Sequence, residues 1–388
     1  MRTWCLLGAC LLAAADAAGR TPLLLPTLRI FQHPVPPPAG GHRASATKTK
    51  PDAPPARYVV DLDEPPEHRW DAVLAEPGLR DAVRATARGL AQVLAPQAAL
   101  VDEFIEAVKP ELGAETLAEA AGIARAVGGG INATDILRAN LVYELTSGCT
   151  VVVAQAADGD GRVLLAANDD GVNGPAVSLQ AITASVRFAR GNATLFDAMH
   201  FVGPTGVSHG VSKGGFAMAQ NMRAFDIGIE AALRENIAAA RAGARIYAEL
   251  ARELFAAGSS YEEALHALAT TNLTNPMFLT VAGPKPGQGT VITRGRSDAQ
   301  VWSIGDGGAW FLVQTNSHHG EGPDDPRRDA ANEAIEALGN SSAALTPSNL
   351  LSKVVGLKPI VDNGDTTFSA AYDAKSGESQ AIVRWSNV

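Results

Sequence analysis

Cysteine is scarce in this chain, and its scarcity limits the chemistry available. The 388 residues contain three cysteines, Cys5, Cys10 and Cys149. A disulfide framework of the kind that stabilises small secreted domains is therefore excluded. Cys5 and Cys10 lie in an apolar N-terminal stretch that we predict to be removed, which leaves Cys149 alone. A single leftover thiol is either a reactive group or a small buried packing residue, and cysteine usage leaves both open.

Basic charge and long apolar runs are also lacking. Asp and Glu outnumber Lys and Arg by 41 to 32, which gives a net charge of −9. We expect no nucleic acid partner, because no basic stripe is present to neutralise phosphates. No apolar run reaches the length of about 20 residues that a membrane-spanning helix needs. The hydrophobic share of 46% nevertheless provides for the core of one large domain or two ordinary ones.

The N-terminus has the pattern of a secretory signal. Arg2 precedes an apolar run from Trp4 to Ala15, and small residues follow through Ala18. We predict a signal peptide over residues 1–18, the alternative being a buried N-terminal helix. A proline-rich stretch over residues 19–56 predicts an extended leader or linker that is not packed. These features place the chain in the secretory pathway, in a lysosome-like compartment or outside the cell.

Sequons for N-glycosylation support secretion modestly. They lie at Asn132, Asn192, Asn272 and Asn340.

Hydrophobic periodicity divides the rest of the chain at Cys149. Residues 57–148 begin with a short strand and then show apolar residues at three- and four-residue spacing, which predicts amphipathic helices separated by Pro96 and Pro110. Such helices can contact a membrane surface, although a stripe facing the core is the commoner cause of the pattern. Helices are expected over 68–75, 79–95, 101–108, 116–127 and 135–141.

Residues 149–388 alternate between strands and helices, which predicts an α+β fold of two antiparallel sheets covered by helices on both outer faces. Strands are expected at 150–155, 163–166, 177–188, 200–202, 215–219, 277–282, 289–293, 300–304, 310–315, 367–372 and 379–384. Helices are expected at 227–255, 261–269, 328–338 and 347–355.

Cys149 stands at the first position of a predicted hairpin, whose turn is DGDG at 158–161. If the Gly148–Cys149 bond were cut, Cys149 would carry a free α-amine beside its thiol. An α-amine titrates near pH 8, so it can accept the thiol proton, and a thiol needs such a base to become a nucleophile. Nucleophile and base would then sit on one residue.

DGDG lacks the other ligands of a calcium loop, and we interpret it as a turn. His318-His319 is not metal spacing and reads as a solvated loop.

Several motifs in one order carry a resemblance to a known family. They are PPARYVVDLDEPPEHRW at 54–70, YELTSGCT at 143–150, GTVITRGR at 289–296, AWFLVQTN ending at Asn316, and DDPRR at 324–328. Together they resemble the acid ceramidase and N-acylethanolamine-hydrolysing acid amidase family of N-terminal-nucleophile hydrolases. The resemblance implies an αββα sandwich with a preceding helical segment. It also implies a precursor that cuts itself before Cys149 into an α/β heterodimer, and then hydrolyses lipid amides without metal or organic cofactor.

The resemblance also assigns roles to residues. Cys149 is the nucleophile, Asp170 orients its amine, and Asn316 stabilises the oxyanion. Asn221 lines the site, and a shared arginine is Arg327 or Arg328. Each of these has an alternative interpretation from the residues alone. Asp170 reads as part of a loop in NDDGVNG, Asn316 as a strand cap, and Arg327 and Arg328 as first-turn residues of a helix paired with Asp324 or Asp325.

The sequence departs from the family pattern at charged positions. The family carries an Arg-Asn-x-Asp run where this chain has Ala167-Asn168-Asp169-Asp170, so alanine replaces a site arginine. Met222 likewise stands at the position of a site glutamate, and the aromatic residue that usually follows TNxxx is missing. Because Cys149, Asp170 and Asn316 are present despite these departures, we expect a lipid amidase acting through Cys149. The alternative is a catalytically weak relative that binds lipid or a partner without turnover, with a different amide substrate as a lesser possibility.

Overall fold

The structure is a computed structural model that describes residues 50–141, 148–171, 177–223, 227–319 and 325–385. The predicted signal peptide and most of the predicted leader lie outside these ranges. The leader was expected to be unpacked through residue 56, and this is wrong for its last residues. Ala53 forms a β-bridge with Val383, and Asp52 Oδ2 lies 3.4 Å from Arg384 Nη1. Packing therefore begins before residue 57.

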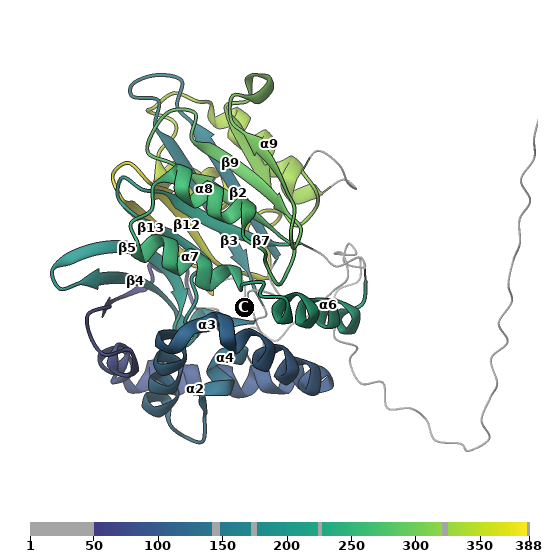
Figure 1. Cartoon of the computed structure of the whole chain (residues 1–388). Helices are drawn as coiled ribbons and strands as arrows, with labels where there is room; N and C mark the ends of the chain where they lie inside the picture. Colours follow the sequence, from purple (N-terminus) through teal and green to yellow (C-terminus); the bar gives the residue numbers. More distant parts are fainter. Residues whose placement is uncertain (1–49, 142–147, 172–176, 224–226, 320–324, 386–388) are drawn as a thin grey trace, which may run out of the picture. The chain divides into compact units, whose positions relative to one another are not determined.

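Short helices and two long ones make up most of the segment before Cys149 (Figure 1). The long helix α2 buries Leu79, Val83, Leu90 and Leu94, so its apolar stripe faces the core. Pro110 was expected to separate two helices, and α3 is broken between the two expected ranges, at Gly113, where φ is 73° and ψ is 162°. Within the described residues this segment comprises β1 Ala56–Asp61, η1 Pro66–His68, α1 Asp71–Leu74, α2 Pro77–Leu94, η2 Ala95–Gln97, α3 Ala98–Val127 and α4 Ala133–Asn140.

Two sheets form the centre of the fold. The eight-stranded sheet has the order β1-β4-β5-β6-β7-β8-β9-β10, and the five-stranded sheet has the order β11-β2-β3-β12-β13. Their remaining strands are β2 Gly148–Gln155, β3 Val163–Asp170, β4 Thr183–Arg190, β5 Ala193–Phe201, β6 His209–Val211, β7 Ala217–Met222, β8 Met277–Ala282, β9 Gly289–Arg294, β10 Ala299–Ser303, β11 Phe311–Gln314, β12 Thr366–Asp373 and β13 Glu378–Val383.

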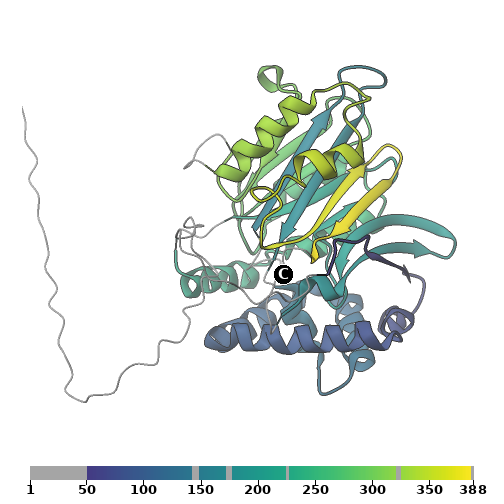
Figure 2. The same ribbon diagram turned by 180° about the vertical axis from the view of Figure 1, so that it is seen from behind.

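Helices cover the outer face of each sheet, which confirms the αββα sandwich. Helices α7 and α8 lie over the eight-stranded sheet, and α9 lies over the five-stranded sheet (Figures 1 and 2). The inner faces meet through β2 and β3 of one sheet and β7 and β8 of the other. The helices after Cys149 are η3 Leu179–Ile182, α6 Ile229–Arg241, α7 Tyr247–Ala256, α8 Tyr261–Thr270, η4 Asp306–Gly308, α9 Pro326–Leu338, α10 Pro347–Asn349 and the π-helix η5 Leu350–Val354.

Three expectations about the strands and helices need correction. The larger sheet is mixed, because β1 pairs with β4 in parallel. Residues 177–188 contain the 3-10 turn η3, and the strand begins only at Thr183. The helical block 227–255 is two helices, α6 and α7, interrupted where Gly243 adopts a φ of 84° that a side chain disfavours.

Strict alternation along β2 and β3 sets the direction of the residues at their ends. Val151 and Val153 belong to the core between the sheets, whereas Val152 and Ala154 pack with α9. On β3, Leu165 likewise faces between the sheets. Continuing the alternation to the strand ends turns Cys149 and Asp169 toward the space between the sheets and Asp170 toward α9.

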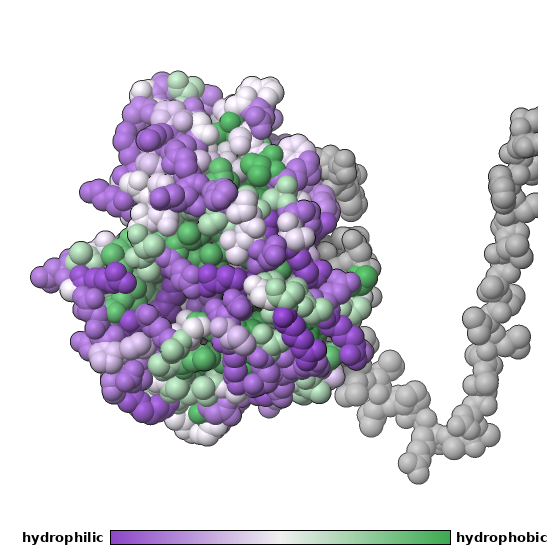
Figure 3. All heavy atoms as spheres, viewed as in Figure 1, coloured by the Kyte–Doolittle hydropathy of each residue, from purple (hydrophilic) through white to green (hydrophobic). Residues whose placement is uncertain are grey.

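The surface shown in Figure 3 is mainly hydrophilic, with apolar patches between polar residues. Among the described residues, the large hydrophobic side chains that are exposed are Val59, Ile227, Val301, Leu357 and Ile360.

Candidate active site

Cys149 is the second residue of β2, and its side chain is completely buried. Its thiol forms no disulfide. Burial raises the pKa of this thiol well above its usual range, and the charges of Asp169 and Asp170 raise it further, while the Arg327 guanidinium acts in the opposite direction. In the uncut chain the sulfur is therefore held as a neutral thiol.

Asn316 is brought to Cys149 by strand register. Strand β11 pairs antiparallel with β2, with Gln314 opposite Val151. Cys149 lies two residues before Val151, and Asn316 lies two residues after Gln314, just beyond the end of β11. There the backbone N–H of Cys149 donates to Asn316 Oδ1 at 2.9 Å. The amide nitrogen of Asn316 donates to Met222 O at 2.8 Å. Asn316 thus joins β2, the strand of Cys149, to the end of β7, and the alternative of a simple strand cap does not describe it.

Arg327 lies in the first turn of α9 and reaches into the same cluster. Its Nη2 donates to Asn316 Oδ1 at 2.8 Å, and its Nη1 lies 3.1 Å from Asp170 Oδ2 and 3.5 Å from Cys149 O. Arg328 instead donates to the carbonyl oxygens of Ser317 and His318. Of the two arginines that the sequence left open, Arg327 is the one at Cys149.

Asp170 is the last residue of β3 and is buried, so the loop interpretation of this residue is wrong. Its carboxylate accepts hydrogen bonds from Thr366 Oγ1 at 2.7 Å and Asn363 Nδ2 at 3.0 Å, in addition to Arg327. Burial raises the pKa of Asp170, and Arg327 and these two donors act in the opposite direction without reversing the shift. The carboxylate also lies against Gly148, its partner across the strands.

Comparisons with known proteins decide the family. The chain is 32% identical to N-acylethanolamine-hydrolysing acid amidase of Rattus norvegicus over 343 residues, 87% of this chain and 90% of that protein. This chain belongs to the acid ceramidase and N-acylethanolamine-hydrolysing acid amidase family. It is also 28% identical to acid ceramidase of Mus musculus over 347 residues, 84% of this chain and 86% of that protein.

A solved structure supports the same assignment. The chain matches the Caenorhabditis elegans N-acylethanolamine-hydrolysing acid amidase orthologue with a TM-score of 0.54 at 27% identity. The match covers 61% of this chain and 99% of that chain. No family model matches the sequence. Membership of this family of amide hydrolases therefore rests on relatives and on fold.

The other residues expected at an amidase site lie on β7 and β3. Asn221 is buried on β7, and its Nδ2 donates to Gln314 O at 3.1 Å, just before Asn316. Met222, at the position where the family pattern has glutamate, is also buried. Ala167, at the arginine position, is buried on β3. The structure thus places apolar side chains at both positions where the amidase pattern carries charge.

Two residues near Cys149 were not singled out from the sequence. Asp169 is opposite Cys149 in the β2–β3 register, and His209 of β6 has Nδ1 3.7 Å from Asp169 Oδ2. Strand alternation was a usable signal for Asp169, since Cys149 and Asp169 both face between the sheets. No local pattern pointed to His209, because β6 was missed as a strand.

The remaining expectations concern the surface. His319 is half-buried, with its ring 4.9 Å from that of Trp302, so the solvated-loop interpretation is wrong for this residue. Among the sequons, Asn132, Asn192 and Asn272 are exposed and Asn340 is partly buried. In the part of the chain that the structure describes, no three His, Cys, Asp or Glu side chains are grouped as metal ligands would be.

Proposed function

We propose that this chain is a cysteine amidase that cuts its own Gly148–Cys149 bond and then hydrolyses the amide bond of fatty acyl lipids, of the N-acylethanolamine or ceramide type. One observation carries the proposal. The nitrogen that would become the α-amine is already bound at 2.9 Å to Asn316, which Arg327 ties to Asp170. A buried cysteine with only a packing role needs none of these polar contacts.

Self-cleavage begins with attack of Cys149 Sγ on the carbonyl carbon of Gly148. A carbon–sulfur bond forms as the carbon–nitrogen bond breaks, and the thiol proton passes to the departing nitrogen. Water then hydrolyses the thioester, which leaves a carboxylate on Gly148 and a free thiol and amine on Cys149. Asp170 lies against Gly148 in the uncut chain. When Gly148 moves away after the cut, the Asp170 carboxylate faces the new amine of Cys149.

Turnover repeats this chemistry on the substrate. The α-amine takes the thiol proton, Sγ attacks the amide carbonyl, and the leaving amine receives that proton as the carbon–nitrogen bond breaks. Water, activated by the α-amine, then releases the fatty acid from the thioester. Asn316 Nδ2 is the donor proposed for the oxyanion, and Asp170 positions the amine and Arg327. The proposed setting is a lysosome-like or extracellular compartment that the chain reaches through the secretory pathway.

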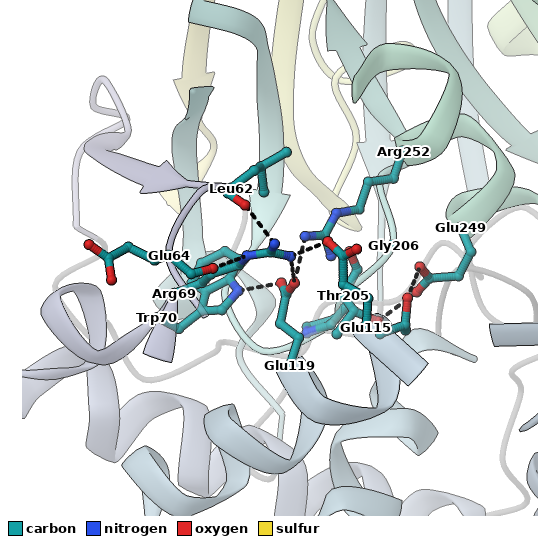
Figure 4. A network of polar contacts seen from close by, with 12 residues as sticks. Leu62, Glu64, Arg69, Trp70, Glu115, Glu119, Thr205, Gly206, Glu249 and Arg252 are labelled. Atoms are coloured by element: carbon teal, nitrogen blue, oxygen red, sulfur yellow. Dashed lines mark hydrogen bonds and ion pairs between the residues drawn. The ribbon is translucent and has the colours of Figure 1, made fainter. Parts of the chain in front are cut away.

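The two fragments of the cut chain can remain together through a buried network (Figure 4). Glu119 of α3 accepts from Arg252 Nη2 at 2.7 Å, from Arg69 Nη1 at 3.1 Å and from Trp70 Nε1 at 2.7 Å. Arg252 lies on α7, after the cut, whereas Glu119, Arg69 and Trp70 lie before it. Asn140 adds a further bond to Thr205 Oγ1 at 2.8 Å. These contacts support an α/β heterodimer.

The apolar pair Ala167 and Met222 favours one alternative, a relative that binds lipid without turnover. A site that has lost a fixed positive charge stabilises a thiolate less well. This alternative keeps the fold and the apolar core and predicts no self-cleavage.

The test compares wild type with Cys149→Ala and Cys149→Ser after secretion from a eukaryotic host. Each protein is incubated at about pH 4.5 and about pH 7.4, on either side of the titration range of histidine. Intact mass then shows whether a fragment begins at Cys149. Fragments in wild type that are absent in Cys149→Ala support the amidase, and release of fatty acid from a lipid amide completes the case. A single uncut wild-type chain under every condition overturns it in favour of the binding protein.

A further inference from the structure

Asp169 is a buried carboxyl without a hydrogen bond beside the nucleophile. Its side chain is 0% exposed, and neither of its oxygens has a hydrogen-bond partner among the residues that the structure describes. Opposite residues on antiparallel strands have Cβ atoms about 5 Å apart, and Asp169 is opposite Cys149 on the same face. A buried polar group left without a hydrogen bond is costly to the fold, so its retention at this position calls for a role.

His209 lies beside Asp169. Its Nδ1 lies 3.7 Å from Asp169 Oδ2 and 2.9 Å from Ser208 Oγ, and its ring packs edge-on against Phe368. Nε2 of His209 has no hydrogen-bond partner in the described ranges. The two side chains therefore form a pair enclosed between the sheets.

The surroundings of Asp169 contain few other charges. Asp170 follows it but faces α9, where Arg327 binds it. Phe368 is opposite it on β12, and β7 and β8, which pack against β3, bring no ionisable side chain. Among the described elements packed around Asp169, the ionisable groups on the same face as its carboxyl are thus Cys149 and His209.

We propose that Asp169, held against His209, is a positioning residue for Cys149: its carboxyl is neutral while the amidase works, and its ionisation suppresses the thiolate and so sets the alkaline limit of the reaction. The inference rests on the proposed amidase function. Ala167 makes the effect stronger, because the arginine that the family pattern places two residues earlier is absent from this face. A negative charge on Asp169 is therefore not offset there.

Electrostatics agree with this geometry. Burial raises the pKa of Asp169 well above its usual range, and the charge of Asp170 raises it further. Burial also lowers the pKa of His209 to about 3, so the imidazole is neutral at the pH of a lysosome and above. The pair is uncharged in acid and becomes negative as pH rises through the pKa of Asp169. That charge is in turn one of the causes that raise the pKa of the Cys149 thiol.

The test is the pH profile of kcat/KM for a fluorogenic long-chain acyl amide, with Asp169→Asn compared to wild type. We expect the ratio of activity on the alkaline limb of that profile to activity at about pH 4.5 to rise by about tenfold, as one unit of pKa implies. Asp160→Asn is the matched control, because it removes a carboxylate from the exposed turn of the same hairpin, where Asp160 pairs with Lys375. This control leaves the ratio at the wild-type value.

A double-mutant cycle separates the proposed role from a structural one. His209→Gln is expected to move the alkaline limb in the wild-type background and to leave it unmoved in the Asp169→Asn background, since the two residues act as a pair. An unchanged pH ratio in a self-cleaved, active Asp169→Asn enzyme overturns the inference and leaves the amidase function standing. A wild-type chain that never cuts itself overturns both.

A second variant and a second measurement guard against misfolding. Asp169→Leu removes the carboxyl and fills its space, and the self-cleaved fraction and Tm of each variant show whether it folds. If neither folds, iodoacetamide alkylation of Cys149 in the wild-type enzyme decides. Because the α-amine of Cys149 also titrates, the rate is compared with that of His209→Gln. A step in the alkylation rate that moves in this variant supports a titrating carboxyl at Asp169, and a step at the same pH in both proteins overturns the inference.

Discussion

The backbone N–H of Cys149 donates to the side-chain oxygen of Asn316, 167 residues further along the chain, at 2.9 Å. The contact exists because β11 and β2 are hydrogen-bonded neighbours in the five-stranded sheet. It places a side chain with both an acceptor and a donor at the Gly148–Cys149 bond, which we propose is cut. Asn316 can therefore hold the Cys149 nitrogen through its oxygen and an oxyanion through its nitrogen.

Replacing Asn316 by Asp separates these two functions. Asp keeps an oxygen that can accept from the Cys149 nitrogen but loses the donor proposed for the oxyanion. We expect kcat of Asn316→Asp to fall by about 10²- to 10³-fold, the cost of removing one oxyanion donor. The measurement is single-turnover acylation at saturating substrate. Wild-type acylation in Asn316→Asp would exclude the amide nitrogen as the donor.

Neighbouring arginines offer a matched comparison. Arg327→Gln leaves Asp170 buried without its cation and removes the bond that holds Asn316 Oδ1, so we expect self-cleavage to slow by about 10²-fold, as misplacement of reacting groups does. Arg328→Gln keeps the whole cluster, because Arg328 contacts only loop carbonyls in the described structure. A gel time course of precursor disappearance measures both. Equal rates for the two variants would contradict the assignment of Arg327 to the site.

The network around Glu119 predicts how the stability of the cut protein depends on pH. Burial alone would raise the pKa of Glu119, but the charges and hydrogen bonds of Arg252, Trp70 and Arg69 outweigh it, and the net shift is downward. A depressed pKa contributes stability that is present above the unfolded value of about 4.3 and is lost as pH falls through the folded value. We expect Glu119→Gln to remove that contribution and to lower Tm.

Size-exclusion chromatography and thermal melting of the cut enzyme test this prediction. Loss of one partner of a buried ion pair costs about 3–5 kcal/mol, which we expect to appear as a lower Tm and a larger share of separated fragments. Glu106→Gln on the same helix α3 is the control, because Glu106 forms an exposed pair with Lys109. If Glu119→Gln and Glu106→Gln melt together, the network does not hold the fragments.

Local pattern was sufficient for much of the fold. Apolar spacing in residues 79–94 gave α2, and β-prone runs around the DGDG turn gave β2 and β3, because period and turn residues are properties of neighbouring residues. It also anticipated a break in α3 between residues 108 and 116, which falls at Gly113. It failed at β6, which is three residues long and receives its hydrogen bonds from β5 and β7. The parallel pairing of β1 with β4 likewise depends on residues more than 120 positions apart.

For the site, the sequence by itself determined which residue we propose as the nucleophile, because Cys149 is one cysteine at the start of a hairpin, after a helical segment and within a recognisable set of motifs. It did not choose between Arg327 and Arg328, because both occupy the first turn of α9 and differ only in direction. It also did not connect Asp169 with His209, since β3 and β6 belong to different sheets. Tertiary structure decided both points. The direction of each arginine depends on how α9 packs on the five-stranded sheet, and the charge on the buried Asp169 carboxyl depends on what the opposing sheet places around it.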